Sequence, residues 1–78
     1  MNITDITGTR SYIKIHFGNK IIKVEGELLI NGFAADKRTM KGWEPPYDKE
    51  PLTDREKQEI IEAVEKKTKG THMVITFE

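Results

Sequence analysis

Few side chains in this sequence could carry out acid–base, nucleophilic or metal chemistry. Its 78 residues include no cysteine, two histidines (His16 and His72) and a single serine, Ser11. Enzymes generally combine a nucleophile, a base and an orienting group, or else bind a metal ion. Ser11 has no catalytic signature around it, and the histidines lack the close spacing of metal ligands. We therefore predict that the protein is not an enzyme, with no catalytic residues, no metal site and no cofactor.

The two histidines leave one enzymatic alternative open. Both lie in segments predicted to be strands, and each faces away from the apolar side chains of its segment. If these two strands were close to each other, the imidazoles could approach, and Asp36 would complete a sparse metal site. Two ordinary surface histidines are the simpler interpretation.

The first set of candidate partner-binding residues lies in segment 37–47, where basic side chains lead into aromatic ones. These candidates are Lys37, Arg38, Lys41, Trp43, Glu44 and Tyr47. Trp and Arg are frequent anchors of protein interfaces. Pro45 and Pro46 are expected to stiffen the segment into an extended path, which lowers the entropic cost of presenting its side chains. Trp43 can instead fold back as the lid of a small core, and both interpretations stay open.

The second set of candidates is acidic. Formal net charge is zero, but residues 1–43 hold seven Lys or Arg against four Asp or Glu, and residues 44–78 hold six against nine. Within the acidic half, Glu59 and Glu62 lie off the apolar stripe of a predicted helix. Such a negative face is either simply solvated or steers the chain towards a basic protein surface.

The strongest local pattern is a β-hairpin over residues 11–25. Apolar and polar residues alternate on both sides of Gly18-Asn19, which predicts a two-residue turn of type II′. This register places five apolar residues on one face: Ile13, Ile15, Phe17, Ile22 and Val24. The opposite face holds Tyr12, Lys14, His16 and Lys23, with the two lysines directly across from each other. An open face of aromatic and basic residues could bind nucleic acid, although zero net charge argues against it.

The rest of the chain predicts a third strand, a loop, a helix and a final strand. Gly26 interrupts the run that follows the hairpin, as a turn or a bulge, and a third strand covers residues 33–36. No regular element is expected over residues 37–51, which contain three prolines. A capping box of Thr53 and Glu56 starts the helix, and Gly70 ends it. Residues 71–77 form the final strand.

This order predicts an α+β fold. A mostly antiparallel sheet, with element order β-β-(β)-loop-α-β, would be covered by one helix from the C-terminal half in a two-layer sandwich. Residues 1–78 are read as one domain. The final strand is expected to lie beside the first hairpin.

Composition limits the compartment and the class of protein. Hydrophobic residues make up 36% of the chain, and the mean hydropathy is −0.60. No apolar run approaches the roughly 20 residues of a membrane-spanning helix, and the N-terminus lacks the apolar segment of a signal peptide. Absence of cysteine removes disulfide scaffolds. We therefore expect a soluble, cytoplasmic protein.

Several segments resemble the immunity protein 74 family of bacterial polymorphic toxin and contact-dependent growth inhibition systems. They are Gly26-Glu-Leu-Leu-Ile-Asn-Gly-Phe33, Trp43-Glu-Pro-Pro46, and Pro51-Leu-Thr followed by an Ile-rich acidic helix. The resemblance runs from about Ile13 to the C-terminus, and its hallmarks are the Gly32-Phe33 pair and the Trp-Glu-Pro-Pro tetrad. Ala34-Ala35-Asp36 departs from a more aromatic segment of the family, which implies a different partner specificity if that segment touches the partner.

The resemblance implies a stoichiometric inhibitor. Such a protein binds the C-terminal toxin domain from a sibling cell, beside or over its active site, and catalyses nothing. It implies no particular contact residues, so the eight candidates above come from their side-chain types alone. The alternative is a small nucleic-acid-binding or scaffold module that uses the exposed sheet face. The oligomeric state stays open.

Overall fold

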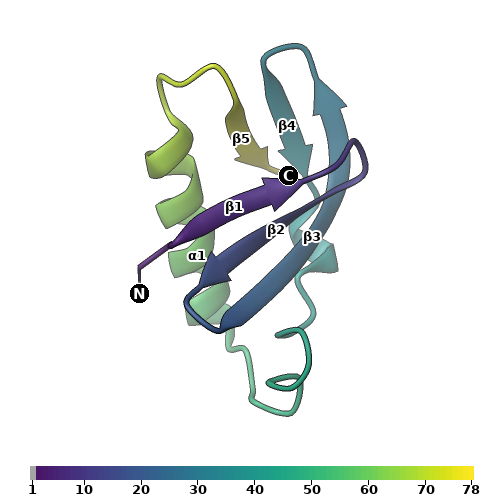
Figure 1. The fold of residues 1–78 in the computed structure, drawn as a ribbon, viewed down its shortest axis with the longest axis vertical. Coiled ribbons are helices and arrows are strands. Elements are labelled where there is room, and N and C mark those ends of the chain that lie inside the picture. Colours follow the sequence, from purple (N-terminus) through teal and green to yellow (C-terminus); the bar gives the residue numbers. More distant parts are fainter. Residues whose placement is uncertain (1) are drawn as a thin grey trace.

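A five-stranded sheet and one α-helix form the fold in a computed structural model that describes residues 2–78 (Figure 1). The elements are β1 (Asp5–Gly8), β2 (Tyr12–Phe17), β3 (Lys20–Leu29), β4 (Gly32–Ala35), the 3₁₀ helix η1 (Lys37–Thr39), α1 (Asp54–Thr68) and β5 (Val74–Phe77). The strands follow the order β1-β2-β3-β4-β5, and only the β4–β5 pair is parallel. The prediction of an α+β fold with one helix against a mostly antiparallel sheet is confirmed.

The β2–β3 hairpin has the predicted register. Phe17 pairs with Lys20, Ile15 with Ile22, and Ile13 with Val24. Gly18 adopts a φ of +66°, a left-handed conformation that favours glycine at the first position of a type II′ turn. A two-residue turn and the alternating pattern therefore specify the same pairing.

Gly26 does not end the strand, contrary to the expected turn or bulge. β3 runs through Gly26 to Leu29, pairing first with β2 and then with β4. A Cβ atom at this position would meet the carbonyl oxygen of Ala34 and lie 2.7 Å from Cε1 of Phe33. Glycine therefore lets β4 approach the middle of a long, curved strand (Figure 1).

β5 lies beside β4 and not beside the first hairpin, so that prediction was wrong. The two strands are parallel, with Phe33 opposite Ile75 and Ala35 opposite Phe77. Parallel neighbours need a long crossover connection, and here η1, the loop and α1 provide it. At the other edge, β1 is an additional strand that was not predicted. It is short and contains one large apolar residue, Ile6.

The helix begins and ends as predicted. Thr53 Oγ1 accepts the backbone N–H of Glu56 at 3.1 Å, while Glu56 Oε1 accepts the backbone N–H of Thr53 at 3.1 Å. Beyond the last turn, Gly70 takes a φ of +80°. The helix buries Ile60, Ile61, Val64 and Thr68. Within residues 2–78, no helix is long and apolar enough to cross a membrane.

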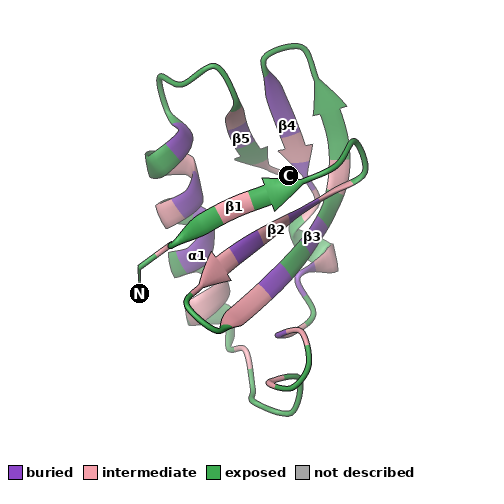
Figure 2. Ribbon diagram, in the orientation of Figure 1, coloured by how far each residue is buried: buried purple, intermediate pink, exposed green. Residues whose placement is uncertain are grey.

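The core lies between α1 and one face of the sheet (Figure 2). The strands contribute Ile13, Ile15, Ile22, Val24, Phe33, Ala35 and Ile75. Met40 and Trp43 join them from the segment between β4 and α1. The prediction that this segment has no regular structure was wrong at its start, where η1 forms with Asp36 as its N-cap.

Candidate partner-binding site

Trp43, the central candidate of segment 37–47, lies in the hydrophobic core. Its side chain is 5% exposed, and its backbone forms an isolated bridge with Ile22. The ring meets that of Phe17 edge-on, with centroids 5.8 Å apart and planes at 88°. Trp43 is therefore the lid of the core and not an exposed aromatic, because burying so large a ring stabilises a small domain. Its contribution to partner binding stays a prediction.

Lys20 holds the Trp43 loop against the hairpin. Its Nζ lies 5.4 Å from the ring centroid of Trp43 and 5.5 Å from that of Tyr47. The same ammonium group is 2.6 Å from Glu50 Oε1. Cation–π contacts at such partly exposed sites contribute about 0.5–1 kcal/mol each. Sequence analysis missed Lys20, since nothing in the local pattern of the hairpin reveals which loop will fold over its turn.

Pro45 and Pro46 do not form the extended path that was expected. Their peptide bond is cis. The following residues make successive turns, in which the N–H of Tyr47 bonds to Glu44 O and the N–H of Glu50 bonds to Tyr47 O. Tyr47 is half-buried and packs against the core. The loop is therefore ordered by its aromatic contacts and its turns.

Arg38 is paired with an acid of the same segment. Its Nε and Nη2 donate to Asp36 Oδ1 and Oδ2, both at 3.0 Å, and its backbone N–H donates to Oδ1 at 3.0 Å. These hydrogen bonds hold the pKa of Asp36 below its ordinary value and raise the pKa of Arg38. A partner would therefore meet an ion pair at Arg38, beside the exposed Lys37.

A shallow hollow of about 470 Å³ brings three of the candidates together. Lys41, Trp43 and Glu44 line it. They share it with charged residues from β3 and the loop: Lys23, Glu25 and Asp48. The hollow therefore carries charges of both signs at its rim, whereas the sequence placed the basic and acidic candidates in separate halves of the chain.

The acidic candidates lie on the exposed side of α1. Glu59 is 3.4 Å from Arg55 Nε, one turn earlier, and its side chain is half exposed. Glu62 is exposed and has no ion pair within the described part of the chain. Neither residue lines the hollow shared by Lys41 and Glu44. Loop and helix thus supply separate candidate surfaces.

The open sheet face has a local partner for its lysines. Lys14 and Lys23 lie opposite each other, as predicted. Lys23 Nζ is 4.4 Å from the ring centroid of Tyr12, and Lys14 Nζ is 6.0 Å from it. Tyr12 therefore offsets part of the repulsion between the two ammonium groups. Because these cations already engage the ring, base stacking on Tyr12 has little support.

The two histidines lie on different elements, and only His16 is in the sheet. His16 lies on β2, and its Nε2 is 3.1 Å from Thr7 Oγ1 of β1. His72 is not in a strand, contrary to expectation, but in the bend before β5. Two strands, β3 and β4, separate β2 from β5. Within residues 2–78, no group of three potential ligands could hold a metal ion.

The segments that resemble the immunity family contain two large core residues, Phe33 and Trp43, while residues 27–31 of the same segments are exposed. Gly32 and Phe33 begin β4, and Phe33 is 2% exposed. Trp43 closes the core at the other end of the β4–α1 connection. Phe33 and Trp43 therefore stabilise the core.

The sequence model of the family described as Immunity protein 74 matches residues 5–78. No curated protein and no solved structure matches the chain. Since the family match extends over nearly the whole chain and includes every strand and the helix, the chain belongs to the Immunity protein 74 family.

Proposed function

We propose that this protein neutralises a cognate bacterial toxin by binding its C-terminal domain in a stoichiometric complex. The observation that carries the proposal is membership of the Immunity protein 74 family over residues 5–78. The protein acts in the cytoplasm of the bacterium that makes it, and it inhibits by contact without catalysing a reaction.

The surface chemistry supports such a role. The loop that Lys20 contacts places Lys41 and Glu44 at a hollow of mixed charge. On the helix, Glu62 is exposed and unpaired among residues 2–78. Charges at the rim of an interface mainly increase the rate of association and select the correct partner. These candidates would therefore guide the toxin domain into place.

The test is recovery of the tagged protein from its source bacterium, followed by identification and purification of the protein bound to it. We expect a toxin domain in a one-to-one ratio, with a Kd of about 1 nM by calorimetry. Adding the purified protein should abolish the activity of that domain at equal concentration. Recovery of RNA alone, lost as salt concentration rises, would contradict the proposal and favour the nucleic-acid alternative.

Charge reversal distinguishes the two candidate surfaces. One variant carries Lys37→Glu and Lys41→Glu, and the other carries Glu59→Lys and Glu62→Lys. The variant that alters the contact surface should slow association by roughly tenfold at low salt, with less effect at high salt. The other variant serves as its matched control. Unchanged association of both would exclude both surfaces.

A further inference from the structure

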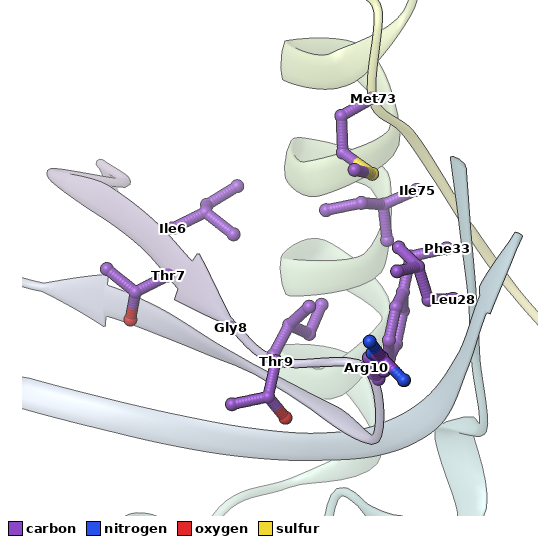
Figure 3. A pocket seen from close by; sticks show the side chains of 10 residues that line it. Ile6, Thr7, Gly8, Thr9, Arg10, Leu28, Phe33, Met73 and Ile75 are labelled. Atoms are coloured by element: carbon purple, nitrogen blue, oxygen red, sulfur yellow. The ribbon is translucent and has the colours of Figure 1, made fainter. Parts of the chain in front are cut away.

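An apolar groove of about 390 Å³ lies between β1 and β5 (Figure 3). Ile6 lies on one side of it, and Met73 and Ile75 lie on the other. The core residues Ile13 and Phe33 also line it. The groove is therefore an opening towards the hydrophobic core along the edge of the sheet.

Exposed apolar residues gather at this end of the protein. Among the described residues, the large hydrophobic side chains classed as exposed are Leu28 (43%), Leu29 (48%), Ile30 (94%) and Met73 (38%). Leu28 and Met73 line the groove itself. Leu29 is the last residue of β3, and Ile30 begins the turn to β4. Leu28 and Met73 therefore extend the apolar surface of the groove, as is typical of a protein-binding surface, whereas Leu29 and Ile30 do not line it.

The backbone of β1 forms an open border of the groove. β1 pairs with β2 alone, and the N–H of Thr9 donates to Tyr12 O in the same register. Alternation along an antiparallel strand then directs the backbone groups of Ile6 and Gly8 away from the sheet. Asp5 Oδ1 accepts the N–H of Ile6 at 2.8 Å. The same alternation turns the N–H of Gly8 away from β2, the strand with which β1 pairs.

A positively charged side chain lies near each end of β1. Arg10 lines the groove at the end of β1. Lys67 lines an adjoining hollow together with Thr4 and Asp5, at the beginning of β1. Neither cation has an ion pair within the described part of the chain. An apolar groove bounded by unpaired cations complements a segment that combines apolar and acidic side chains.

We propose that an extended segment of the toxin domain pairs with the outer edge of β1, inserts apolar side chains into the groove and directs acidic side chains towards Arg10 and Lys67. Main-chain hydrogen bonds to an edge strand, with specificity from side-chain pockets, are an established mode of peptide recognition. The inference rests on the proposed function, since the toxin domain is the partner. It assigns the anchoring contact to the groove, whereas the loop and helix charges act on association.

The central test compares two adjacent leucines that are similarly exposed. Leu28→Glu places a carboxylate in the groove, opposite Phe33 on the same face. Leu29→Glu places the same carboxylate on the other face of β3 and is the matched control. We expect Leu28→Glu to weaken toxin binding at least about tenfold, mainly through faster dissociation, and Leu29→Glu to change it less than about twofold.

Met73→Glu is a second groove variant, just before β5, in case Leu28→Glu disturbs the fold. Urea midpoints of all variants establish that they remain folded. Arg10→Glu should also weaken binding, and Lys49→Glu, in the loop before α1, is its control. If wild-type protein binds the toxin but groove and control variants bind equally well, this inference is wrong and the proposed function stands. If wild-type protein binds no toxin, the proposed function itself fails.

Amide hydrogen exchange tests the backbone pairing. Binding should slow exchange at Gly8, whose N–H points away from β2, and leave exposed turns such as Asn19 unchanged. Unchanged exchange at Gly8 in the complex would exclude strand pairing even if Leu28 proved important. Light scattering then measures the oligomeric state of the free protein. A stable dimer that Leu28→Glu converts to a monomer would show that the groove binds a second copy of this chain, and it would overturn the proposal.

Discussion

The two edges of the sheet are completed in different ways. On β5, the outward N–H of Ile75 donates to Thr68 Oγ1 at 3.1 Å, and that of Phe77 donates to Glu65 Oε2 at 3.2 Å. On β1, the side chain of Asp5 accepts the outward N–H of Ile6, and the N–H of Gly8 points away from β2. Side chains of the helix therefore close one edge and leave the other available for pairing.

The difference follows from the path of the chain. α1 leads directly into β5, so its last turns lie alongside that strand and can reach its backbone. β1 comes first in the chain, and most of its residues are exposed (Figure 2). A protein with one helix can cover one edge by this means. An open edge next to an apolar groove is a candidate contact surface, whereas a closed edge contributes to stability.

Gly26→Ala should have the largest effect on stability, because Gly26 lies in β3, the central strand that pairs with β2 on one side and with β4 on the other. The new Cβ would meet the carbonyl oxygen of Ala34. Backbone does not yield as a flexible side chain does, so we expect a loss of about 3 kcal/mol in the free energy of unfolding, measured by urea denaturation.

Gly42→Ala is the matched control for that substitution. An added Cβ at Gly42 would have no atom within 4 Å, and its φ is not in the left-handed region. We expect a stability within about 1 kcal/mol of the wild type, with a small gain from the stiffer unfolded chain. Equal losses at both glycines would show that the close approach of β4 at Gly26 is unimportant.

Thr68→Val tests the closed edge directly. Thr68 is buried, donates to Val64 O at 2.9 Å and accepts the N–H of Ile75. Valine keeps the shape but leaves a buried N–H without a partner, so we expect a loss of about 2 kcal/mol and faster exchange at the Ile75 amide. Thr76→Val, at an exposed position of β5 next to Ile75, is the control and should change stability by less than about 0.5 kcal/mol. A similar result for both would remove the contrast between the edges.

Asp5→Ala should have the smallest effect, because it acts on the open edge. The carboxylate of Asp5 is exposed and accepts one N–H that water can satisfy instead. We expect stability to change by less than about 0.5 kcal/mol in urea denaturation, while exchange at the Ile6 amide becomes faster. A loss above about 1 kcal/mol would indicate that this edge is as tightly secured as β5.

Local sequence determined the elements whose information is contained in neighbouring residues. Gly18-Asn19 and the alternating residues around it specify the β2–β3 register, and Thr53 with Glu56 specifies the start of α1. Both signals act within a few residues, so they can be read without knowledge of the fold. Of the candidate site residues, the sequence predicted the charge types but not their pairing, as Arg38 with Asp36 illustrates.

Tertiary structure decided what depends on residues far apart in the chain. Trp43 became a core residue because Ile22 and Phe17 meet it there, and Lys20 became its anchor for the same reason. β5 pairs with β4 across the long connection through η1 and α1, and the local pattern of neither strand specifies that pairing. The groove beside the open edge of β1 forms only when the fold brings β1 and β5 together. Sequence alone therefore determined the family and the local elements, whereas burial, edge closure and the contact surface required the three-dimensional arrangement.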